Sequence, residues 1–82
     1  MTTAKITKTP SRVILAKNLR ILRAARDWSQ VKLSEKSGVD AKYIVGLEAG
    51  KRKPSLDTLD KLALAFGLAP FELLQPRDKA AR

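Results

Sequence analysis

The sequence predicts an all-α protein, a compact domain of five helices with short connections. Apolar residues recur three and four positions apart along most of the chain, which is the spacing of one face of an α-helix. Ser and Asp residues precede these apolar stripes and glycines follow them, as is typical where helices begin and end. No segment alternates apolar and polar residues as a half-buried strand does. The 82 residues are therefore expected to form a single small domain.

The first two helices have clear start and stop signals. The first is expected over 12–26. Its buried stripe is formed by Leu15, Leu19, Leu22 and Ala25. Ser29 is a good N-cap for a second helix over 30–37, in which Leu33 is the main buried residue. Gly38 ends that helix, because glycine adopts the left-handed conformation of a helix end without steric cost.

Two further helices follow the same pattern. Asp40 is expected to cap a third helix over 41–49, and Gly50 to stop it. Ser55 caps a fourth helix, which Gly67 closes. The apolar stripe of this fourth helix comprises Leu56, Leu59, Leu62, Ala63 and Phe66.

The end of the chain predicts one more helix. A proline suits the first position of a short fifth helix over 70–74, and Pro76 prevents its continuation. We therefore divide the chain into a flexible basic arm over 1–10, a helical domain over 11–75 and a flexible tail over 76–82.

Basic residues dominate the charge. Seventeen Lys and Arg residues against eight Asp and Glu residues give a net charge of +9 at pH 7. Residues 1–26 hold seven of these basic residues and no acidic residue. An excess of this size on so short a chain indicates a polyanionic partner, either nucleic acid or an anionic membrane surface. A basic N-terminal segment without acidic residues is also typical of a mitochondrial transit peptide. Cleavage of such a peptide would remove the buried stripe of the first helix from the domain, which disfavours this interpretation.

The composition excludes several kinds of site. The chain holds neither Cys nor His, so it has no thiol nucleophile, disulfide, imidazole base or zinc site built on these residues. The acidic residues are scattered over helix faces and caps, and no glycine-rich phosphate loop occurs. The longest apolar runs are far shorter than the roughly 20 residues of a membrane span. We therefore expect no enzymatic activity, metal, cofactor or membrane partner, and a place in the cytoplasm.

The window 30–49 is the most informative part of the sequence. Two short helices are joined there by Gly38 and Val39, and the small Ser34 stands where the helices must cross closely. This pattern is typical of a helix-turn-helix, whose second helix keeps an exposed outer face. Over about residues 13–74 the sequence resembles the lambda-repressor-like, XRE-type helix-turn-helix family. The residues that carry the resemblance are Leu19, Arg20, Leu22, Arg23, Trp28, Ser29, Gln30, Leu33, Ser34, Lys36, Ser37, Gly38, Val39, Tyr43, Ile44, Leu47, Glu48, Gly50, Lys51, Arg52, Pro54, Ser55, Leu59, Leu62, Ala63, Ala65, Phe66, Gly67, Leu68, Glu72, Leu73 and Leu74.

The resemblance implies that the third helix docks in the major groove of double-stranded DNA. The candidate base-reading residues are Asp40, Ala41, Lys42, Tyr43, Val45 and Gly46. Lys42 is the best direct reader, because a lysine in the major groove can donate to guanine O6 and N7. Tyr43 either contacts DNA, by donating to a phosphate or packing on a base, or packs as a half-buried core aromatic. Gly46 stands where relatives often carry a long polar residue, which indicates sparse base readout and more use of DNA shape.

The candidate phosphate contacts are Gln30, Lys51, Arg52, Lys53 and Arg26. Gln30 stands at the start of the second helix, where free backbone N–H groups bind phosphate oxygens. The basic run 51–53 follows the third helix, at the place where similar proteins grip the DNA backbone. Such contacts give affinity without sequence information and a steep salt dependence.

Three further positions matter to the resemblance. Arg23 and Glu48 occupy the places of an ion pair that ties the first helix to the end of the third. Asp27 stands where glycine is common, and aspartate tolerates the left-handed conformation better than most residues. Trp28 falls at a usual Leu or Met position and is expected in the core.

A homodimer is expected from the resemblance and from size, because a single DNA-binding module buries only about 600–1,000 Å². The candidate interface is Phe71, Leu73 and Leu74, unless these residues merely close the core. The sequence therefore predicts a transcriptional regulator from a bacterium or phage, a repressor or a restriction-modification controller. It is expected to bind a pseudo-palindromic operator at the nucleoid.

The main alternative is an antitoxin-type module that neutralises a toxin partner and binds DNA secondarily. Only residues 75–82 are spare for a toxin-neutralising segment, which favours the stand-alone regulator. RNA binding is disfavoured because an aromatic stacking platform is lacking. A basic membrane-surface peptide would not explain the capped helices that follow the first.

Overall fold

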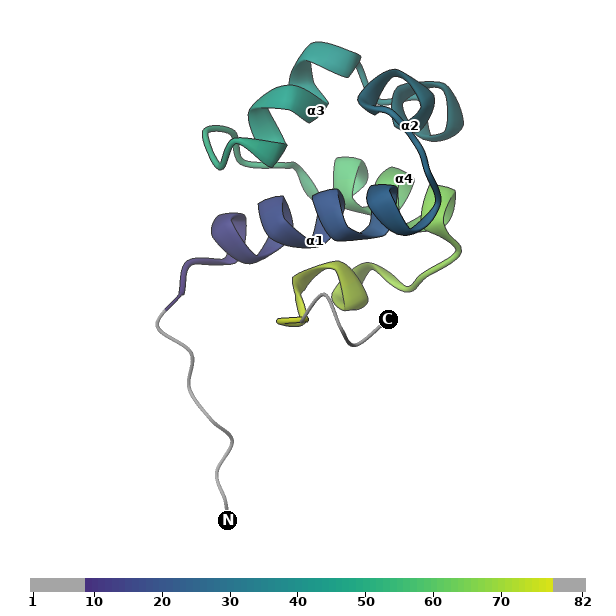
Figure 1. Cartoon of the computed structure of the whole chain (residues 1–82). Helices are drawn as coiled ribbons and strands as arrows, with labels where there is room; N and C mark the ends of the chain where they lie inside the picture. Colours follow the sequence, from purple (N-terminus) through teal and green to yellow (C-terminus); the bar gives the residue numbers. More distant parts are fainter. Residues whose placement is uncertain (1–8, 78–82) are drawn as a thin grey trace.

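Four α-helices and one short 3-10 helix form the fold (Figure 1). The structure is a computed structural model that describes residues 9–77. Most of the expected arm over 1–10 and tail over 76–82 lies outside this range. The elements are α1 (Ser11–Ala25), α2 (Gln30–Ser37), α3 (Ala41–Glu48), α4 (Leu56–Phe66) and η1 (Pro70–Leu74). Residues 9–77 contain no strand, so the all-α prediction is confirmed.

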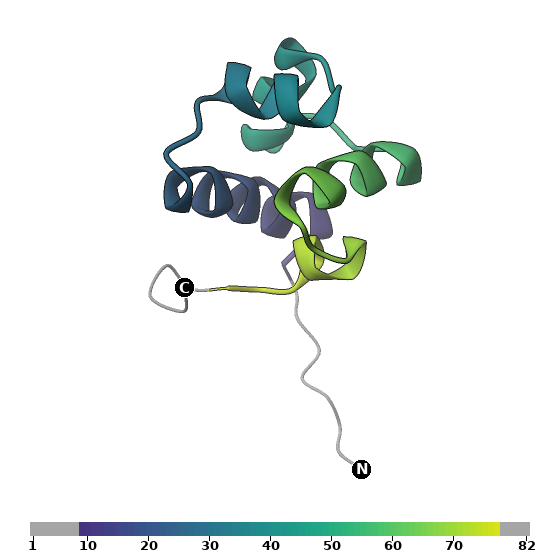
Figure 2. The same cartoon turned by 90° about the vertical axis from the view of Figure 1, so that its right-hand side faces the viewer.

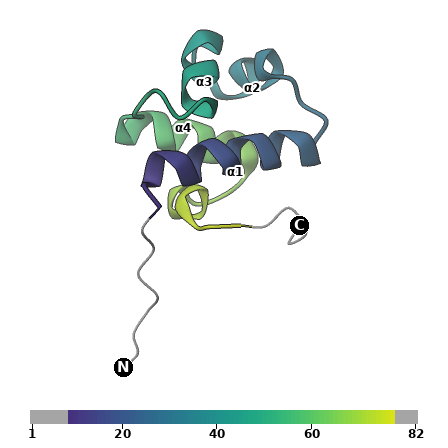
Figure 3. The same ribbon diagram turned by 60° about the vertical axis from the view of Figure 1, so that its left-hand side comes forward.

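The helices stack in layers. α2 and α3 lie together on one side of α1 and α4, and η1 covers the opposite side (Figures 1 and 2). The loop that follows α3 lies above the first turn of α1 (Figure 3). One broad face of the α2–α3 pair is therefore left uncovered by the other helices. Across residues 9–77, every helix falls short of the length and apolar content needed to cross a bilayer.

The helix starts and stops agree with the sequence signals. Ser29 and Ser55 each accept a hydrogen bond from the backbone N–H three residues on, at 2.9 and 3.0 Å. Asp40 accepts from the N–H groups of Lys42 at 3.0 Å and Tyr43 at 3.3 Å. Each of these N-caps contributes about 1 kcal/mol to helix stability. Gly38 and Gly67 end α2 and α4 in the left-handed conformation, with φ of 79° and 74°.

Asp27 ends α1 in place of the usual glycine. Its φ is 57°, within the left-handed region. Its N–H donates to the Ala24 carbonyl at 3.1 Å, and the N–H of Trp28 donates to the Arg23 carbonyl at 3.0 Å. This pair of bonds is the Schellman pattern of a helix end, which glycine usually adopts. The short polar side chain of aspartate is therefore sufficient to keep the turn.

The predicted fifth α-helix is wrong, because residues 70–74 form the 3-10 helix η1. The segment has only five residues and starts with a proline, which has no N–H to donate. Gln75 is extended, with φ −83° and ψ 130°, because the ring of Pro76 disfavours the helical conformation in the residue before it. The Glu72 carboxylate accepts from the Ala69 N–H at 2.8 Å and fixes the start of η1.

The apolar stripes of the five elements meet in one core. The buried core residues are Leu15, Leu19, Leu22, Leu33, Val39, Ile44, Leu47, Leu59, Leu62, Ala63, Phe66 and Leu73. Trp28 is half-buried, and its ring stacks on that of Phe66 with centroids 5.5 Å apart. Ala25 and Leu56, expected in the buried stripes, are exposed in the end turns of α1 and α4.

One buried polar side chain joins α1 to η1. Asn18 is 0% exposed. Its Nδ2 donates to the carbonyls of Leu73 and Gln75, at 2.7 and 2.8 Å. Because these carbonyls belong to the end of η1 and the residue after it, Asn18 fixes η1 against α1.

Candidate nucleic-acid interface

A tight turn joins α2 to α3. The Gly38 N–H donates to the Ser34 carbonyl at 2.8 Å, and the Val39 N–H donates to Oγ of Ser37 at 3.1 Å. Val39 is buried and holds the turn against the core. The α2–α3 pair therefore has the geometry of a helix-turn-helix, with one side of α3 packed inward and the other turned outward.

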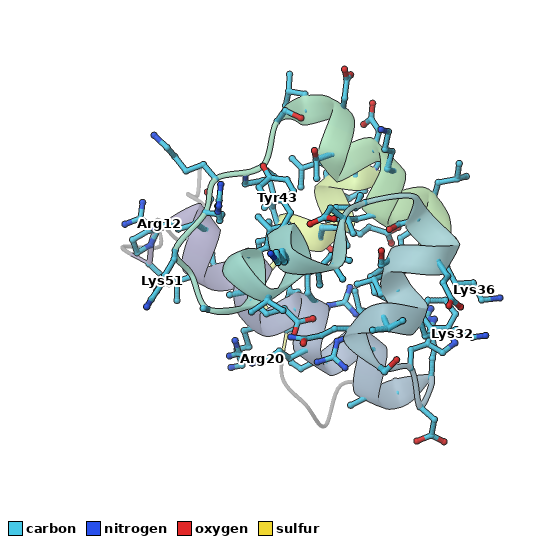
Figure 4. All side chains as sticks on the ribbon, turned by 90° about the horizontal axis from the view of Figure 1, so that it is seen from above. Arg12, Arg20, Lys32, Lys36, Tyr43 and Lys51 are labelled. Atoms are coloured by element: carbon cyan, nitrogen blue, oxygen red, sulfur yellow. The ribbon has the colours of Figure 1, made fainter. Side chains whose placement is uncertain are left out.

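The outward side of α3 offers a small accessible surface (Figure 4). Ile44 and Leu47 are buried, whereas Lys42 and Val45 are exposed and Ala41 is half-buried. Lys42 and Val45 are therefore the exposed base-reading candidates within α3, and Asp40 is exposed at its start.

Two other predicted base-reading residues use their side chains in hydrogen bonds to the protein's own backbone. Oδ2 of Asp40 accepts the first N–H groups of α3, so this carboxylate serves as a helix cap. Tyr43 is half-buried, and its hydroxyl donates to the Lys53 carbonyl at 2.7 Å. In the absence of DNA, Tyr43 therefore packs as a half-buried core aromatic. Its hydroxyl proton is used in the bond to the Lys53 carbonyl.

The loop after α3 folds back on that helix. Gly50 has φ 73°, and its N–H donates to the Leu47 carbonyl at 3.1 Å. The Lys51 N–H donates to the Gly46 carbonyl at 2.9 Å, which completes a Schellman pattern. Nε of Arg12 donates to the Gly50 carbonyl at 3.1 Å. The loop is therefore fastened both to α3 and to α1.

Arg52 lies differently from the two lysines that flank it. All three residues are exposed, and Lys51 and Lys53 make no side-chain bond in the described part of the chain. The Arg52 side chain instead lies along α3, with its guanidinium carbon 5.7 Å from the centroid of the Tyr43 ring. Its Nε and Cδ are 3.3 and 3.4 Å from the position that a Cβ on Gly46 would occupy. The three predicted phosphate contacts of this loop are thus not equivalent.

Arg23 and Glu48 form an ion pair. Nε of Arg23 lies 2.7 Å from Oε2 of Glu48, and Nη2 lies 2.8 Å from Oε1. The third nitrogen donates to the Trp28 carbonyl at 2.8 Å, and Arg20 donates to the Glu48 carbonyl. The hydrogen bonds and charge of Glu48 raise the pKa of the Arg23 guanidinium above its usual value, against a smaller opposing effect of burial. This group of contacts fixes the end of α3 to α1.

Two predicted phosphate contacts are occupied within the protein. Nε2 of Gln30 donates to Oε1 of Glu48 at 3.0 Å, so the amide faces α3 instead of solvent. Arg26 donates to the Leu22 carbonyl at 3.1 Å and to the Phe66 carbonyl at 3.0 Å. Arg26 therefore closes the C-terminus of α4, where the helix dipole favours a cation. Both residues therefore support the fold in the absence of DNA, and their contacts with phosphate stay a prediction.

The three residues of the predicted dimer interface differ in exposure. Leu73 is 0% exposed and belongs to the core, and Leu74 is half-buried against it. Only Phe71 of the three is exposed, at 64%. Two of the candidates therefore close the core, because η1 packs on α1 and α4 through them.

Basic side chains outside the predicted set flank the α2–α3 face (Figure 4). Arg12 and Arg20 lie on the α3 side, and each donates to a carbonyl at the end of α3 or in the loop after it. Lys32 and Lys36 lie on the α2 side. The sequence shows that both arginines belong to the basic segment 1–26. Their place beside α3 follows only from the fold.

A family model described as helix-turn-helix matches residues 19–73. The chain belongs to this family. The match extends from α1 into η1 and includes the turn and the outward side of α3 described above.

This helix-turn-helix protein has relatives among known proteins, and it spans less than two thirds of the length of the first of them described here. A hypothetical transcription factor of Neisseria meningitidis serogroup B is 35% identical over 65 residues, which cover 79% of this chain and 61% of that relative. The crystal structure of the hypothetical transcription factor NHTF from Neisseria matches with a TM-score of 0.81 and 28% identity, over 99% of this chain and 93% of that one. The restriction-modification controller protein C.AhdI from Aeromonas hydrophila matches with a TM-score of 0.72 and 42% identity, over 76% and 94% of the two chains.

Proposed function

We propose that the protein is a sequence-specific, DNA-binding transcriptional regulator that places α3 in the major groove of double-stranded DNA. The observation that carries this proposal is the outward side of α3, presented by a helix-turn-helix and bordered on both sides by basic side chains. A groove about 12 Å wide admits one α-helix. The protein performs no catalysis in this role.

The charge distribution suits a DNA backbone. The exposed Lys51 and Lys53 follow α3, where phosphates of a docked duplex pass. The whole chain carries a net charge of +9. Each phosphate that these side chains neutralise releases counterions, so the affinity should fall steeply as salt is raised.

We further propose that the protein binds a pseudo-palindromic operator as a homodimer. One module of this size buries about 600–1,000 Å² on DNA, so tight specific binding generally needs two half-sites. The exposed Phe71 is the candidate that remains for the contact between two copies.

The regulatory role we infer is that of a repressor or a restriction-modification controller in the cytoplasm of a bacterium. The 42% identity with C.AhdI supports the second of these. The antitoxin alternative has no comparable support among the relatives named above. A pull-down that recovers a toxin in place of DNA would favour it.

Selection of binding sites from a random DNA library tests the proposed function. The purified protein is used at roughly physiological salt, so that non-specific contacts are weakened. We expect enrichment of a two-fold symmetric site. Binding that appears only at low salt, with no enriched site, would reduce the interaction to general charge attraction and overturn the proposal.

A further inference from the structure

We propose that Arg52 reads a base from the loop after α3, through the space that Gly46 leaves open on that helix. The ligand is a guanine edge in the major groove. This inference rests on the proposed function and deepens it, because it names a specificity residue where the sequence predicts a phosphate anchor.

The space on α3 comes from a missing side chain. A Cβ on Gly46 would overlap Cγ of Arg52 and would lie 3.3 Å from its Nε. Any other residue at position 46 would therefore displace Arg52 from the helix surface. Gly46 supplies no long polar side chain to α3, and the long polar side chain of Arg52, from the loop, lies in that place instead.

The loop holds Arg52 in place from both sides. On one side, the Lys51 N–H donates to the Gly46 carbonyl at 2.9 Å. On the other, the Tyr43 hydroxyl donates to the Lys53 carbonyl at 2.7 Å. Arg52 lies between these two bonds, so its backbone keeps a fixed distance from α3. Preorganisation of this kind lowers the entropy lost on binding.

The guanidinium of Arg52 keeps its hydrogen-bond donors free. It lies over the Tyr43 ring, with a carbon-to-centroid distance of 5.7 Å, and this contact uses no N–H group. The other arginines within residues 9–77 all donate to protein oxygens, whereas Arg52 donates to none there. A free planar fork is the group that binds O6 and N7 of guanine together.

The position of Arg52 favours a base over a phosphate. Its side chain lies against α3 at Tyr43 and Gly46, and the exposed Lys42 and Val45 are the residues directly before these two. These residues share the part of α3 that would face the floor of the groove. Lys51 and Lys53 lie at the end of the helix instead, where the DNA backbone passes.

The test compares four proteins on the operator selected by the wild type and on its single-base variants. We expect the wild type to prefer guanine at one position of each half-site by about 5- to 150-fold, the range for one bidentate pair. Arg52→Ala and Arg52→Lys should lose this preference and keep the preferences at other positions. Arg52→Lys keeps the charge, so its salt dependence should stay close to that of the wild type. The matched control, Lys51→Ala, should weaken binding to every sequence about equally and keep the guanine preference.

A fourth variant tests the space itself. Gly46→Ala should fold at least as well as the wild type, because alanine favours the helix more than glycine does. It should nevertheless lose the guanine preference, since its Cβ displaces Arg52.

The outcomes separate this inference from the proposed function. If the wild type selects a site and Arg52→Ala weakens all sequences equally, Arg52 is a phosphate anchor and the inference is overturned alone. If Gly46→Ala keeps the guanine preference, the claim that Arg52 needs the space at Gly46 is overturned. If the wild type selects no site at any salt concentration, the proposed function fails and this inference fails with it.

Discussion

Arg23 of α1 and Glu48 of α3 form a bidentate ion pair, with N–O distances of 2.7 and 2.8 Å. Glu48 is the last residue of α3 and Arg23 lies in the last turn of α1, so the pair joins the ends of these two helices. Arg20 adds a bond to the backbone carbonyl of the same residue. The orientation of α3 toward a DNA groove therefore depends on contacts that do not touch DNA.

Removing the guanidinium should destabilise the fold. In Arg23→Ala, the Glu48 side chain, which is only 4% exposed, loses two of its hydrogen bonds and its counter-charge. We expect a loss of about 3 kcal/mol in the free energy of unfolding, the lower end for a broken buried pair, because Gln30 still donates to the carboxylate. Urea unfolding measures this loss. Lys17→Ala, at an exposed position of α1, is the control, and equal midpoints for the two variants would contradict the prediction.

The same pair predicts how stability responds to alkaline pH. The pKa of Arg23 is raised in the folded state, so its contribution is complete below the pKa of the unfolded chain and is lost only as pH rises through the higher folded value. The difference in free energy of unfolding between the wild type and Arg23→Ala should therefore stay constant from about pH 7 to 10. A difference that shrinks within this range would show that the pair is weaker than its geometry indicates.

The buried amide of Asn18 should be needed for η1 to stay attached. Asn18→Leu fills a similar volume but leaves the carbonyls of Leu73 and Gln75 without their donor. The expected cost is about 1–3 kcal/mol, the desolvation penalty of an unpaired buried group. Thermal unfolding measures this cost, with Ile21→Leu as a conservative control on α1. An unchanged melting temperature would mean that η1 is held by apolar packing alone.

Asp27 carries a mild conformational strain that glycine should relieve. Its φ is 57°, and a side chain in this region costs energy that glycine does not pay. We expect Asp27→Gly to raise the free energy of unfolding by about 0.5–1 kcal/mol. Asp27→Val should lower it, because branched side chains adopt this conformation poorly. If both substitutions lower stability equally, the Asp27 side chain has another role in the turn.

Much of the fold could be predicted because the signals that set it are local. Ser29, Asp40 and Ser55 mark the starts of α2, α3 and α4, and each cap is satisfied by a bond only two or three residues away. The type of the last helix could not be predicted in this way. Its length and the effect of Pro76 on Gln75 decided between an α-helix and a 3-10 helix.

Two of the predicted phosphate contacts have hydrogen-bond partners far along the chain, which the sequence did not indicate. Arg26 donates to the Phe66 carbonyl, 40 residues away, and Gln30 donates to Glu48, 18 residues away. A basic or polar residue at a helix end gives no local sign of such a partner. Asn18 did carry a signal, because it interrupts the apolar stripe between Leu15 and Leu22 with a short amide. A polar residue in that place is typical of a buried hydrogen bond.

Base readers and phosphate anchors should differ in their response to sequence and salt. Lys42→Ala removes an exposed side chain from α3 and should relax the preference at one base pair, at a cost of about 1–3 kcal/mol. Lys53→Ala removes an exposed charge from the loop and should weaken binding to all sequences, with the salt slope reduced by about one. Titrations of the operator and a scrambled duplex at several salt concentrations separate the two patterns. Identical behaviour of the variants would mean that the two residues share one role.

The docking of α3 in the major groove is tested most directly by methylation interference on the selected operator. Methylation of guanine N7 blocks the major groove, whereas methylation of adenine N3 blocks the minor groove. We expect N7 methylation of guanines in both half-sites to abolish binding, and N3 methylation of adenines in the same half-sites to have little effect. Interference confined to adenine N3 would place the protein in the minor groove and contradict the role assigned to α3.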